Sequence, residues 1–183
     1  MKAMTTRRLF LASAASLLAA PALARSERGR LELAQSATLS RNEIRLPPGV
    51  TVTQGLTLAP GTRLLADRAG STLKLSGPGP LLRVEHADRI EIENVAFDGA
   101  RAAREGALIE ARDVGDVVMQ GCVVRNAGRD AIRLERCGGR VSDVTIRNAG
   151  RGGLFSLDSR GLILRGLHVE DIGDNAIQIW TST

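Results

Sequence analysis

The chain has 183 residues, of which 43% are hydrophobic and 25% are charged, and its formal net charge is +5. This composition is typical of a globular protein with its own core, and it excludes a disordered chain or a polytopic membrane protein. The four aromatic residues include no tyrosine, which argues against a binding face built on ring stacking. The 20 glycines indicate many tight turns, and only two of the 25 basic residues are lysines, so an arginine-rich surface is expected.

The first 24 residues have the organisation of an export signal. Basic residues precede an apolar stretch, residues 9–20, and Ala22 and Ala24 form a small-x-small cleavage site. The apolar stretch is too short to span a bilayer, which takes about 20 residues, so we expect no stable membrane span. Residues 1–24 carry three basic and no acidic residues, which leaves a net charge of +2 on the rest. With no basic run there, nucleic acid is not expected as a partner.

The signal also matches a more specific pattern. Residues 6–11 (TRRLFL), with Arg7 and Arg8 as the pair, resemble the twin-arginine signal, although Ala12 stands where that signal usually has lysine. The resemblance implies a bacterial protein that crosses the membrane already folded, to the periplasm or beyond, with the twin-arginine export machinery as its partner. General secretion is the alternative. Export in the folded state leaves open whether a cofactor is bound.

Similar segments recur through the second half of the chain. The strings VRNAGRDAI, IRNAGRGGL and VEDIGDNAI begin at residues 124, 146 and 169, so the periods are 22 and 23 residues. In an earlier copy, residues 92–99, Phe97 stands in the place of Val124. The period there is 27 residues, because residues 99–106 carry extra residues. Such a period indicates a stacked repeat architecture.

Apolar residues alternate within each copy, as in Ile90 and Ile92 or Cys122 and Val124. Alternation over short β-branched runs indicates strands with one buried face. A unit of this length cannot bury a core alone, so it must stack on its neighbours. We therefore predict an all-β fold, a right-handed single-stranded parallel β-helix of about six coils over residues 44–183, after an N-terminal cap at 25–43. Leucine-rich repeats have a similar length, but their Leu-x-x-Leu-x-Leu frame is absent.

The twin-arginine pair, followed by these repeats, resembles the twin-arginine-translocated β-helix repeat proteins. The string LPPG at 46–49 and the Asn-Ala-Gly coils are similar to the pectate lyase-like (pectin lyase fold) superfamily. The second resemblance implies a fold and not a function. Residues 176–183 read as one strand of a coil with no polar cap after it, so we expect an N-terminal fragment whose C-terminal coils or cap are missing.

Three polar residues, Asn126, Asn148 and Asp171, occupy one place in successive coils, and Asp98 takes it in the earlier copy. Side chains at such a position are expected to bond to one another and to the backbone, which forms a structural ladder. Ligand contacts are the alternative interpretation.

The turn that follows this position varies from coil to coil. Because stacked strands lie about 4.8 Å apart, we expect Arg129 and Arg151 to share one surface stripe, with Asp174 a coil further. Arginine suits a carboxylate-bearing polymer, and aspartate suits a base or a metal ligand. Arg129, Asp130, Arg151 and Asp174 are therefore candidate substrate-binding residues, with residues 99–106 projecting beside them. A solvated turn with offsetting charges is the alternative.

No catalytic residue can be selected from the sequence. Asp98, Asp130, Asp158 and Asp174 are the carboxylates available for a hydrolase pair, but spacing does not choose two of them. The Asp-Pro-His-Asp motif of the polyuronide epimerases of this fold is absent, and no His/Cys cluster predicts a metal site.

Two positions concern the core rather than the site. Cys122 is expected to point inward and Cys137 to sit at a turn, and the aligned positions do not bring the two together for a disulfide. Residues 153–157 (GLFSL) allow either Leu154 or Phe155 to point inward.

Two functions remain. The first is an exported β-helix protein that acts on an acidic polysaccharide by lyase- or epimerase-like chemistry: a base abstracts the proton next to a uronate carboxylate while arginine neutralises the developing charge. The second is a non-catalytic carbohydrate-binding or cell-envelope scaffold protein, which the missing catalytic signatures favour. Whether the protein is an enzyme is therefore left open at this point.

Overall fold

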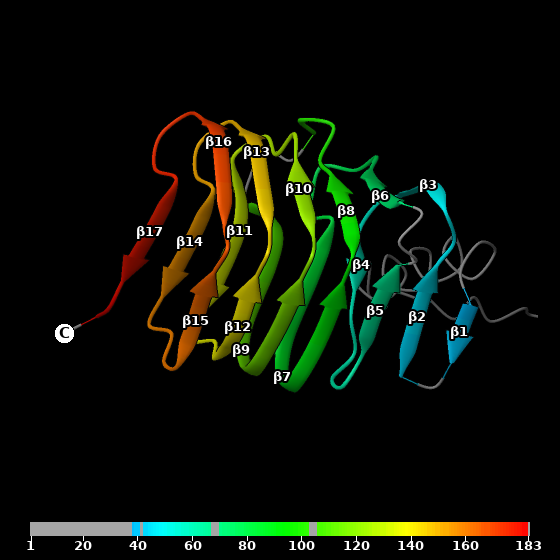
Figure 1. Ribbon diagram of the computed structural model, residues 1–183, viewed down its shortest axis with the longest axis horizontal. Helices are drawn as coiled ribbons and strands as arrows, with labels where there is room; N and C mark the ends of the chain where they lie inside the picture. Colours follow the sequence, from blue (N-terminus) through cyan, green and yellow to red (C-terminus); the bar gives the residue numbers. More distant parts are fainter. Residues whose placement is uncertain (1–37, 41, 67–69, 103–105, 183) are drawn as a thin grey trace, which may run out of the picture.

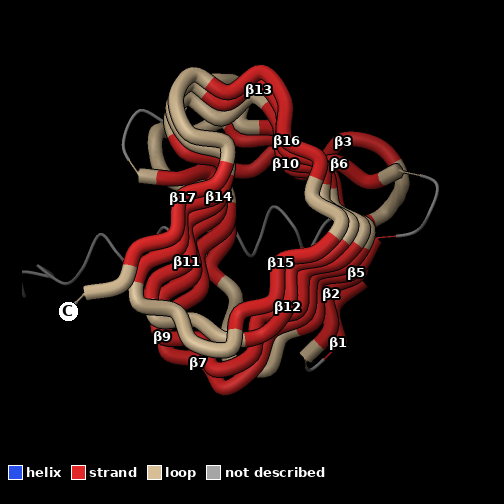
Figure 2. Tube along the Cα trace, turned by 60° about the vertical axis from the view of Figure 1, so that its left-hand side comes forward, coloured by secondary structure: helices blue, strands red, loops and turns tan. Residues whose placement is uncertain are grey.

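The computed structural model describes residues 38–40, 42–66, 70–102 and 106–182, and these wind into a helix of parallel β-strands (Figure 1). In a view roughly along the helix axis, each turn of the chain runs along three faces, which are named I, II and III (Figure 2). Face III is a sheet of six strands, one from each turn, so the helix has about six turns. The described residues contain no α-helix. The predicted all-β fold with about six coils is confirmed.

The strands of the three faces follow one another in the same order in every full turn. Face I consists of β4 (Leu56–Thr57), the first parts of β7 (Leu82–Glu93) and β9 (Ala107–Gln120), β11 (Asp130–Glu135), β14 (Leu154–Leu157) and β17 (Ile177–Trp180). Face II consists of β2 (Glu43–Leu46), β5 (Arg63–Ala66), the second parts of β7 and β9, β12 (Gly139–Ser142) and β15 (Leu162–Arg165). Face III consists of β3 (Gly49–Thr53), β6 (Ser71–Leu75), β8 (Val95–Asp98), β10 (Val123–Arg125), β13 (Thr145–Ala149) and β16 (His168–Ile172).

Single residues in the left-handed conformation turn the chain between faces. Faces I and II meet at a corner where φ lies between 51° and 53°, formed by His86, Asp113, Arg136 and Asp158. Faces II and III meet at a corner formed by Asn94, Gly121, Asp143 and Gly166, with φ between 53° and 63°. Asn, Asp and Gly adopt this conformation at the lowest cost, which is why they recur in the second corner. β7 and β9 run through the first corner without interruption.

The register confirms the repeat alignment. On face III, Phe97 pairs with Val124, Val124 with Ile146 and Ile146 with Val169, all in parallel strands. The first three side chains are fully buried, and Val169 packs against the core from the last turn. Alternate residues therefore point inward, as the sequence pattern predicted.

The structure decides the positions that the pattern left open or marginal. Leu154 points inward and is 1% exposed, while Phe155 points outward. Cys122 and Cys137 are both buried free thiols. Desolvation by burial raises the pKa of the Cys122 thiol to about 12, so the thiol stays protonated and unreactive at neutral pH.

The N-terminal end has one antiparallel strand. β1 (Thr38–Ser40) pairs antiparallel with β2, whereas every other strand pair is parallel among the described residues. The proposed export signal, residues 1–24, and residues 25–37 of the predicted cap lie outside the described residues.

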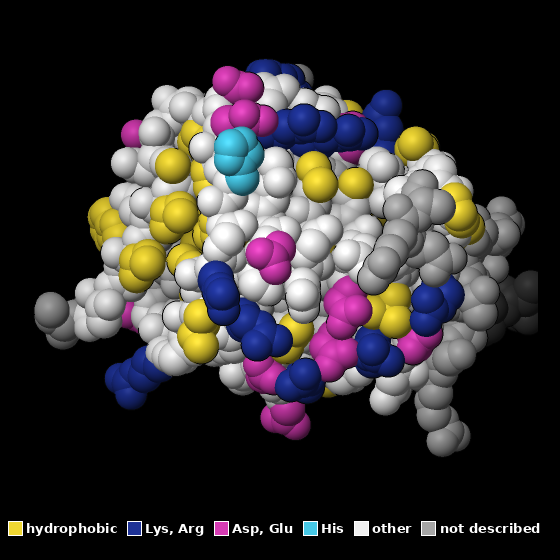
Figure 3. All heavy atoms as spheres, in the orientation of Figure 1, with side chains coloured by type: hydrophobic (Ala, Val, Ile, Leu, Met, Phe, Trp, Pro, Cys, Tyr) yellow, Lys and Arg dark blue, Asp and Glu magenta, His cyan; other side chains and the backbone are white. Residues whose placement is uncertain are grey.

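Outward-facing arginines are paired with carboxylates on neighbouring turns. On face II the Arg63 guanidinium bonds to Glu91 (2.5 Å) and Glu43 (3.2 Å) on the two neighbouring turns. Arg89 bonds to Asp116 on the next turn and to Glu91 on its own strand (2.7 Å). Figure 3 shows basic and acidic side chains interleaved over this face. Much of the arginine content therefore serves inter-turn ion pairs, each of which contributes little alone at a solvated surface.

The close stacking of turns predicts a specific glycine requirement. A Cβ atom on Gly150 would lie 2.4 Å from the Gly128 carbonyl oxygen in the turn below, so Gly150→Ala must push two backbones apart. We expect the free energy of unfolding to fall by about 1–3 kcal/mol in urea titrations. Gly79→Ala is the matched control, because no atom lies within 4 Å of its added Cβ. Equal stabilities for the two variants would contradict this account of the stacking.

Candidate functional site

The residues of the predicted stripe lie in one stack at the turn from face III to face I. The Arg151 amide donates to the Arg129 carbonyl (3.1 Å), and the Asp174 amide donates to the Arg151 carbonyl (2.8 Å). All three side chains are exposed. Within the described part of the chain, Arg129 makes no ion pair, whereas Arg151 lies 3.7 Å from Asp130. The stack therefore offers two adjacent guanidinium groups to solvent.

Asp130, the fourth predicted residue, has a different environment. It is the first residue of β11 rather than a surface turn residue, and it is 4% exposed. Its Oδ1 accepts a hydrogen bond from the Gly152 amide of the next turn (3.0 Å). Asp130 therefore fastens one turn to the next, and only its ion pair with Arg151 connects it to the stack.

The predicted ladder forms over part of its length. The Asn148 side-chain amide donates to Asn126 Oδ1 (2.6 Å), and that of Asn126 donates to Asp98 Oδ1 (2.9 Å). Asp98 pairs in register with Arg125, one residue before the aligned position, and its carboxylate reaches Asn126 from there. Asp171 is exposed and makes no side-chain hydrogen bond within the described residues.

The start of the insertion, residues 99–102, lies against the ladder instead of projecting from it. The Arg101 guanidinium donates to Asn148 Oδ1, and the Arg101 amide donates to the Asn126 carbonyl (2.8 Å). Ala102 packs against the core. Residues 103–105 of the insertion lie outside the described residues.

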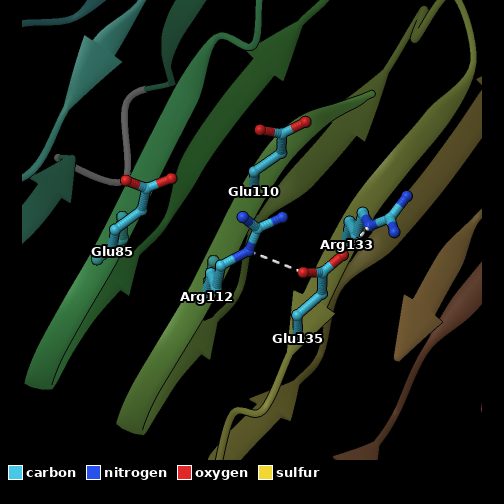
Figure 4. Close-up of a pocket in the computed structure, with 7 residues that line it drawn as sticks. Glu85, Glu110, Arg112, Arg133 and Glu135 are labelled. Atoms are coloured by element: carbon cyan, nitrogen blue, oxygen red, sulfur yellow. Dashed lines mark hydrogen bonds and ion pairs between the residues drawn. The ribbon is translucent and has the colours of Figure 1, made fainter. Parts of the chain in front are cut away.

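A hollow of about 220 Å³ lies on the outer surface of face I. Five charged side chains around it come from β7, β9 and β11 and are drawn in Figure 4: Glu85, Glu110, Arg112, Arg133 and Glu135. They belong to two rows that run across the turns, since Glu110 pairs in register with Arg133, and Arg112 pairs with both Glu85 and Glu135. Acidic and basic side chains alternate along each row.

Ion pairs hold most of these groups in place. Glu135, with 8% of its side chain exposed, accepts hydrogen bonds from Arg112 (2.8 Å) and Arg133 (2.6 Å). Glu110 bonds to Arg83 (3.0 Å) and to the Ala107 amide (3.1 Å). Glu85 is exposed and makes no ion pair among the described residues. The hollow thus combines fixed donors and acceptors with one free carboxylate.

The arginine stack borders the same face. Arg129 immediately precedes β11, and Arg151 lies three residues before β14. The distance from Arg129 to Arg133 along β11 is about 13 Å at the usual strand rise. In Figure 2 the III-to-I turns stand out beyond the strands of face I. Arg129 therefore stands at the start of β11, the strand that contributes Arg133 and Glu135 to the hollow.

The two aromatic side chains at the C-terminal end of face I lie side by side. Phe155 and Trp180 have ring centroids 6.3 Å apart, and the Arg133 guanidinium lies 5.0 Å from the centre of the Phe155 ring. The low aromatic content argued against a surface of stacked rings, yet both rings lie on one face, and Arg133 of the hollow contacts the Phe155 ring.

The family-model comparison agrees with the coiled architecture. Residues 81–183, more than half of the chain, match the model described as a right-handed beta helix region. The chain belongs to the right-handed β-helix family. No curated protein and no solved structure matches the chain. Membership confirms the predicted handedness and leaves the chemistry to be argued from the site.

The electrostatics of the right-handed β-helix site favour binding over proton transfer. Burial of Glu135 disfavours its charged form, but the hydrogen bonds and charges of Arg133 and Arg112 outweigh burial and hold its pKa below the ordinary value. Glu135 is therefore ionised at neutral pH with both oxygens in ion pairs. A general acid would need a raised pKa, and a general base would need a free oxygen.

Three of the four carboxylates considered for a hydrolase pair also accept structural hydrogen bonds. Asp98 accepts bonds from Asn126, the Ala100 amide and Arg125, which together overcome the effect of burial and lower its pKa. Asp158 accepts two bonds from Ser182, from its amide and its hydroxyl, and its pKa is lowered. Only Asp174 of the four is exposed without a side-chain bond in the described part of the chain.

Other features of the described residues bear on ligands. No group of three or more His, Cys, Asp or Glu side chains there is placed to hold a metal ion.

The described residues also include no helix long and apolar enough to cross a membrane.

Sequence reasoning missed the hollow on face I. Its charged residues come from three turns of different length. Alternation alone marks each of them only as an outward strand position. One signal was available: Arg and Glu alternate between aligned positions 83, 110 and 133, and again at 85, 112 and 135. Aligning outward residues across turns would have shown this pattern.

The ion pairs of Glu135 with Arg112 and Arg133 predict a pH-dependent contribution to stability. Because its pKa is lowered in the folded state, the stabilisation is present above the unfolded-state pKa and is lost as pH falls through the folded-state pKa. We expect Glu135→Gln to lower the free energy of unfolding by about 1–2 kcal/mol at pH 7, since Arg112 and Arg133 are partly solvated. The deficit should shrink as pH falls below the ordinary glutamate pKa and vanish once Glu135 is protonated in the folded state as well. Glu85→Gln is the control, because Glu85 makes no ion pair among the described residues. A deficit in the free energy of unfolding that does not depend on pH would contradict a stabilising role for the two ion pairs of Glu135.

Proposed function

We propose that this protein is an exported, non-catalytic β-helix scaffold that binds an acidic polysaccharide along face I and its arginine border. The observation that carries the proposal is the exposed stack of Arg129 and Arg151 beside a face of alternating charged side chains. Guanidinium groups bind carboxylates through paired, charge-assisted hydrogen bonds. Two of them one turn apart, about 4.8 Å, suit a polymer that repeats its carboxylates.

The proposal of binding without turnover rests on the state of the carboxylates. Glu135, Asp98 and Asp130 accept structural hydrogen bonds, and a residue so engaged is poorly placed to move a proton of the ligand. Export by the twin-arginine machinery to the periplasm or beyond is part of the same proposal. It is supported by Arg7, Arg8 and the cleavage site at Ala22 and Ala24.

Binding is expected to depend on the two stacked arginines. Arg129→Ala and Arg151→Ala should each weaken binding of an oligogalacturonate by about 3- to 10-fold, measured by calorimetry at low salt, because each removes one carboxylate contact. Raising the salt concentration should weaken binding further, since the contacts are solvated.

Arg140→Ala is the matched control for these variants. Arg140 is an exposed arginine on face II that makes no ion pair among the described residues, so its loss changes net charge equally. If Arg140→Ala weakens binding as much as Arg129→Ala, the effect is one of overall charge and the proposed site is wrong.

A second candidate function is lyase- or epimerase-like chemistry on the same polymer. The observation in its favour is Asp174, an exposed carboxylate stacked directly after Arg151. Asp174 would take the proton from the carbon next to the uronate carboxylate while Arg151 neutralises the charge that develops on that carboxylate. In a lyase the electron pair would form a double bond as the neighbouring glycosidic C–O bond breaks and the leaving oxygen takes a proton from water, and in an epimerase the carbon would take a proton from water on its opposite face. This chemistry predicts an ultraviolet-absorbing unsaturated product or epimerised uronate in long incubations, and its loss in Asp174→Asn. We expect neither product, and turnover abolished by Asp174→Asn would replace the scaffold proposal.

A further inference from the structure

Two aromatic side chains on face I lie outside the core: Phe155 is half-buried and Trp180 is exposed. Phe97 is fully buried, but Phe155 and Trp180 point outward, and Trp180 is 58% exposed. Their rings are tilted by 55° with centroids 6.3 Å apart. Neither ring contributes to the core of the helix, and leaving such large apolar groups in water has a cost that a ligand would remove.

Polar groups surround the two rings. Register places Gln178 beside Phe155 and Leu157 beside Trp180. On the other side, Arg133 lies over the Phe155 ring and bonds to Glu135, which leads into the hollow. The apolar surface of the two rings is therefore bordered by the Gln178 amide and the Arg133 guanidinium.

We propose that Phe155 and Trp180 form a stacking platform for a sugar ring of the bound polysaccharide. A pyranose ring has a face of C–H groups, formed in galacturonate by the hydrogens on C3, C4 and C5, which packs on aromatic π-systems, and it has a rim of hydroxyl groups. Gln178 and Arg133 are placed to bond to that rim. The platform selects saccharides with such a face, and this inference rests on the proposed function.

A second copy of the chain fits this surface less well. A stable protein interface takes about 800 Å² from each partner, with a mainly apolar centre. The apolar outward side chains of Phe155, Leu157 and Trp180 adjoin the charged rows of Arg133 and Glu135. A self-complementary interface here would desolvate those ion pairs, whereas a hydroxyl-bearing ligand can bond to them.

The platform carries its own spectroscopic reporter. Trp180 is the only tryptophan and the chain has no tyrosine, so intrinsic fluorescence reports on this surface alone. We expect oligogalacturonate to change Trp180 emission saturably, with the dissociation constant that calorimetry gives. Phe155→Ala should weaken binding by about 2- to 12-fold. Val50→Ala is the control, because Val50 is an apolar side chain 63% exposed on face III.

The outcomes separate this inference from the proposed function. Binding that Arg129→Ala weakens, without a change in Trp180 emission or an effect of Phe155→Ala, overturns the platform and leaves the proposed function. A neutral β-1,4-glucan oligosaccharide that shifts Trp180 emission equally in wild type and Arg129→Ala supports the platform and overturns the acidic ligand. Emission that changes with protein concentration, together with a dimer in sedimentation, identifies a second copy as the occupant and overturns the platform.

Discussion

The in-register stacking of one turn on the next is the constraint on which the rest of this structure depends. Parallel strands exchange evenly spaced backbone hydrogen bonds, so every residue has an equivalent about 4.8 Å above or below it. Close stacking excludes even a methyl group at Gly150, and it brings Asn126 and Asn148 near enough to bond. A side chain is therefore selected together with its neighbours in adjacent turns.

The same constraint accounts for part of the arginine content. An outward arginine in one turn stands beside an outward residue of the next, and a carboxylate there removes the repulsion that like charges would cause. Arg63 with Glu91 and Arg112 with Glu135 follow this rule. Arg129 and Arg151 depart from it, because two arginines are adjacent and Arg129 has no ion pair within the described residues. An arginine without an ion pair gains most from an anionic ligand.

Face I contains three kinds of surface in continuous succession. The arginine stack lies at its border, the hollow with Glu135 at its centre, and Phe155 with Trp180 towards the last turn. Each matches one part of a uronic acid polymer: the carboxylates, the hydroxyl groups and the C–H face of the ring. The lowered pKa of Glu135 fits a role in binding, because the ion pairs that lower it also keep the charged rows fixed before a ligand arrives.

The architecture could be predicted from the amino-acid sequence, because the period of 22–23 residues and the inward alternation of residues such as Cys122 and Val124 are local properties of the chain. The sequence also located the stack of Arg129, Arg151 and Asp174, since aligned positions in a repeat must lie above one another. Only the tertiary structure decided that Asp130 is buried, that Leu154 rather than Phe155 enters the core, and that Arg101 lies on the ladder. It alone showed that Phe155 meets Trp180 and that Arg112 bonds to Glu135 rather than Glu85. The physical reason is that alternation assigns a side chain to a face, whereas its partner there depends on rotamers and on neighbours from other turns.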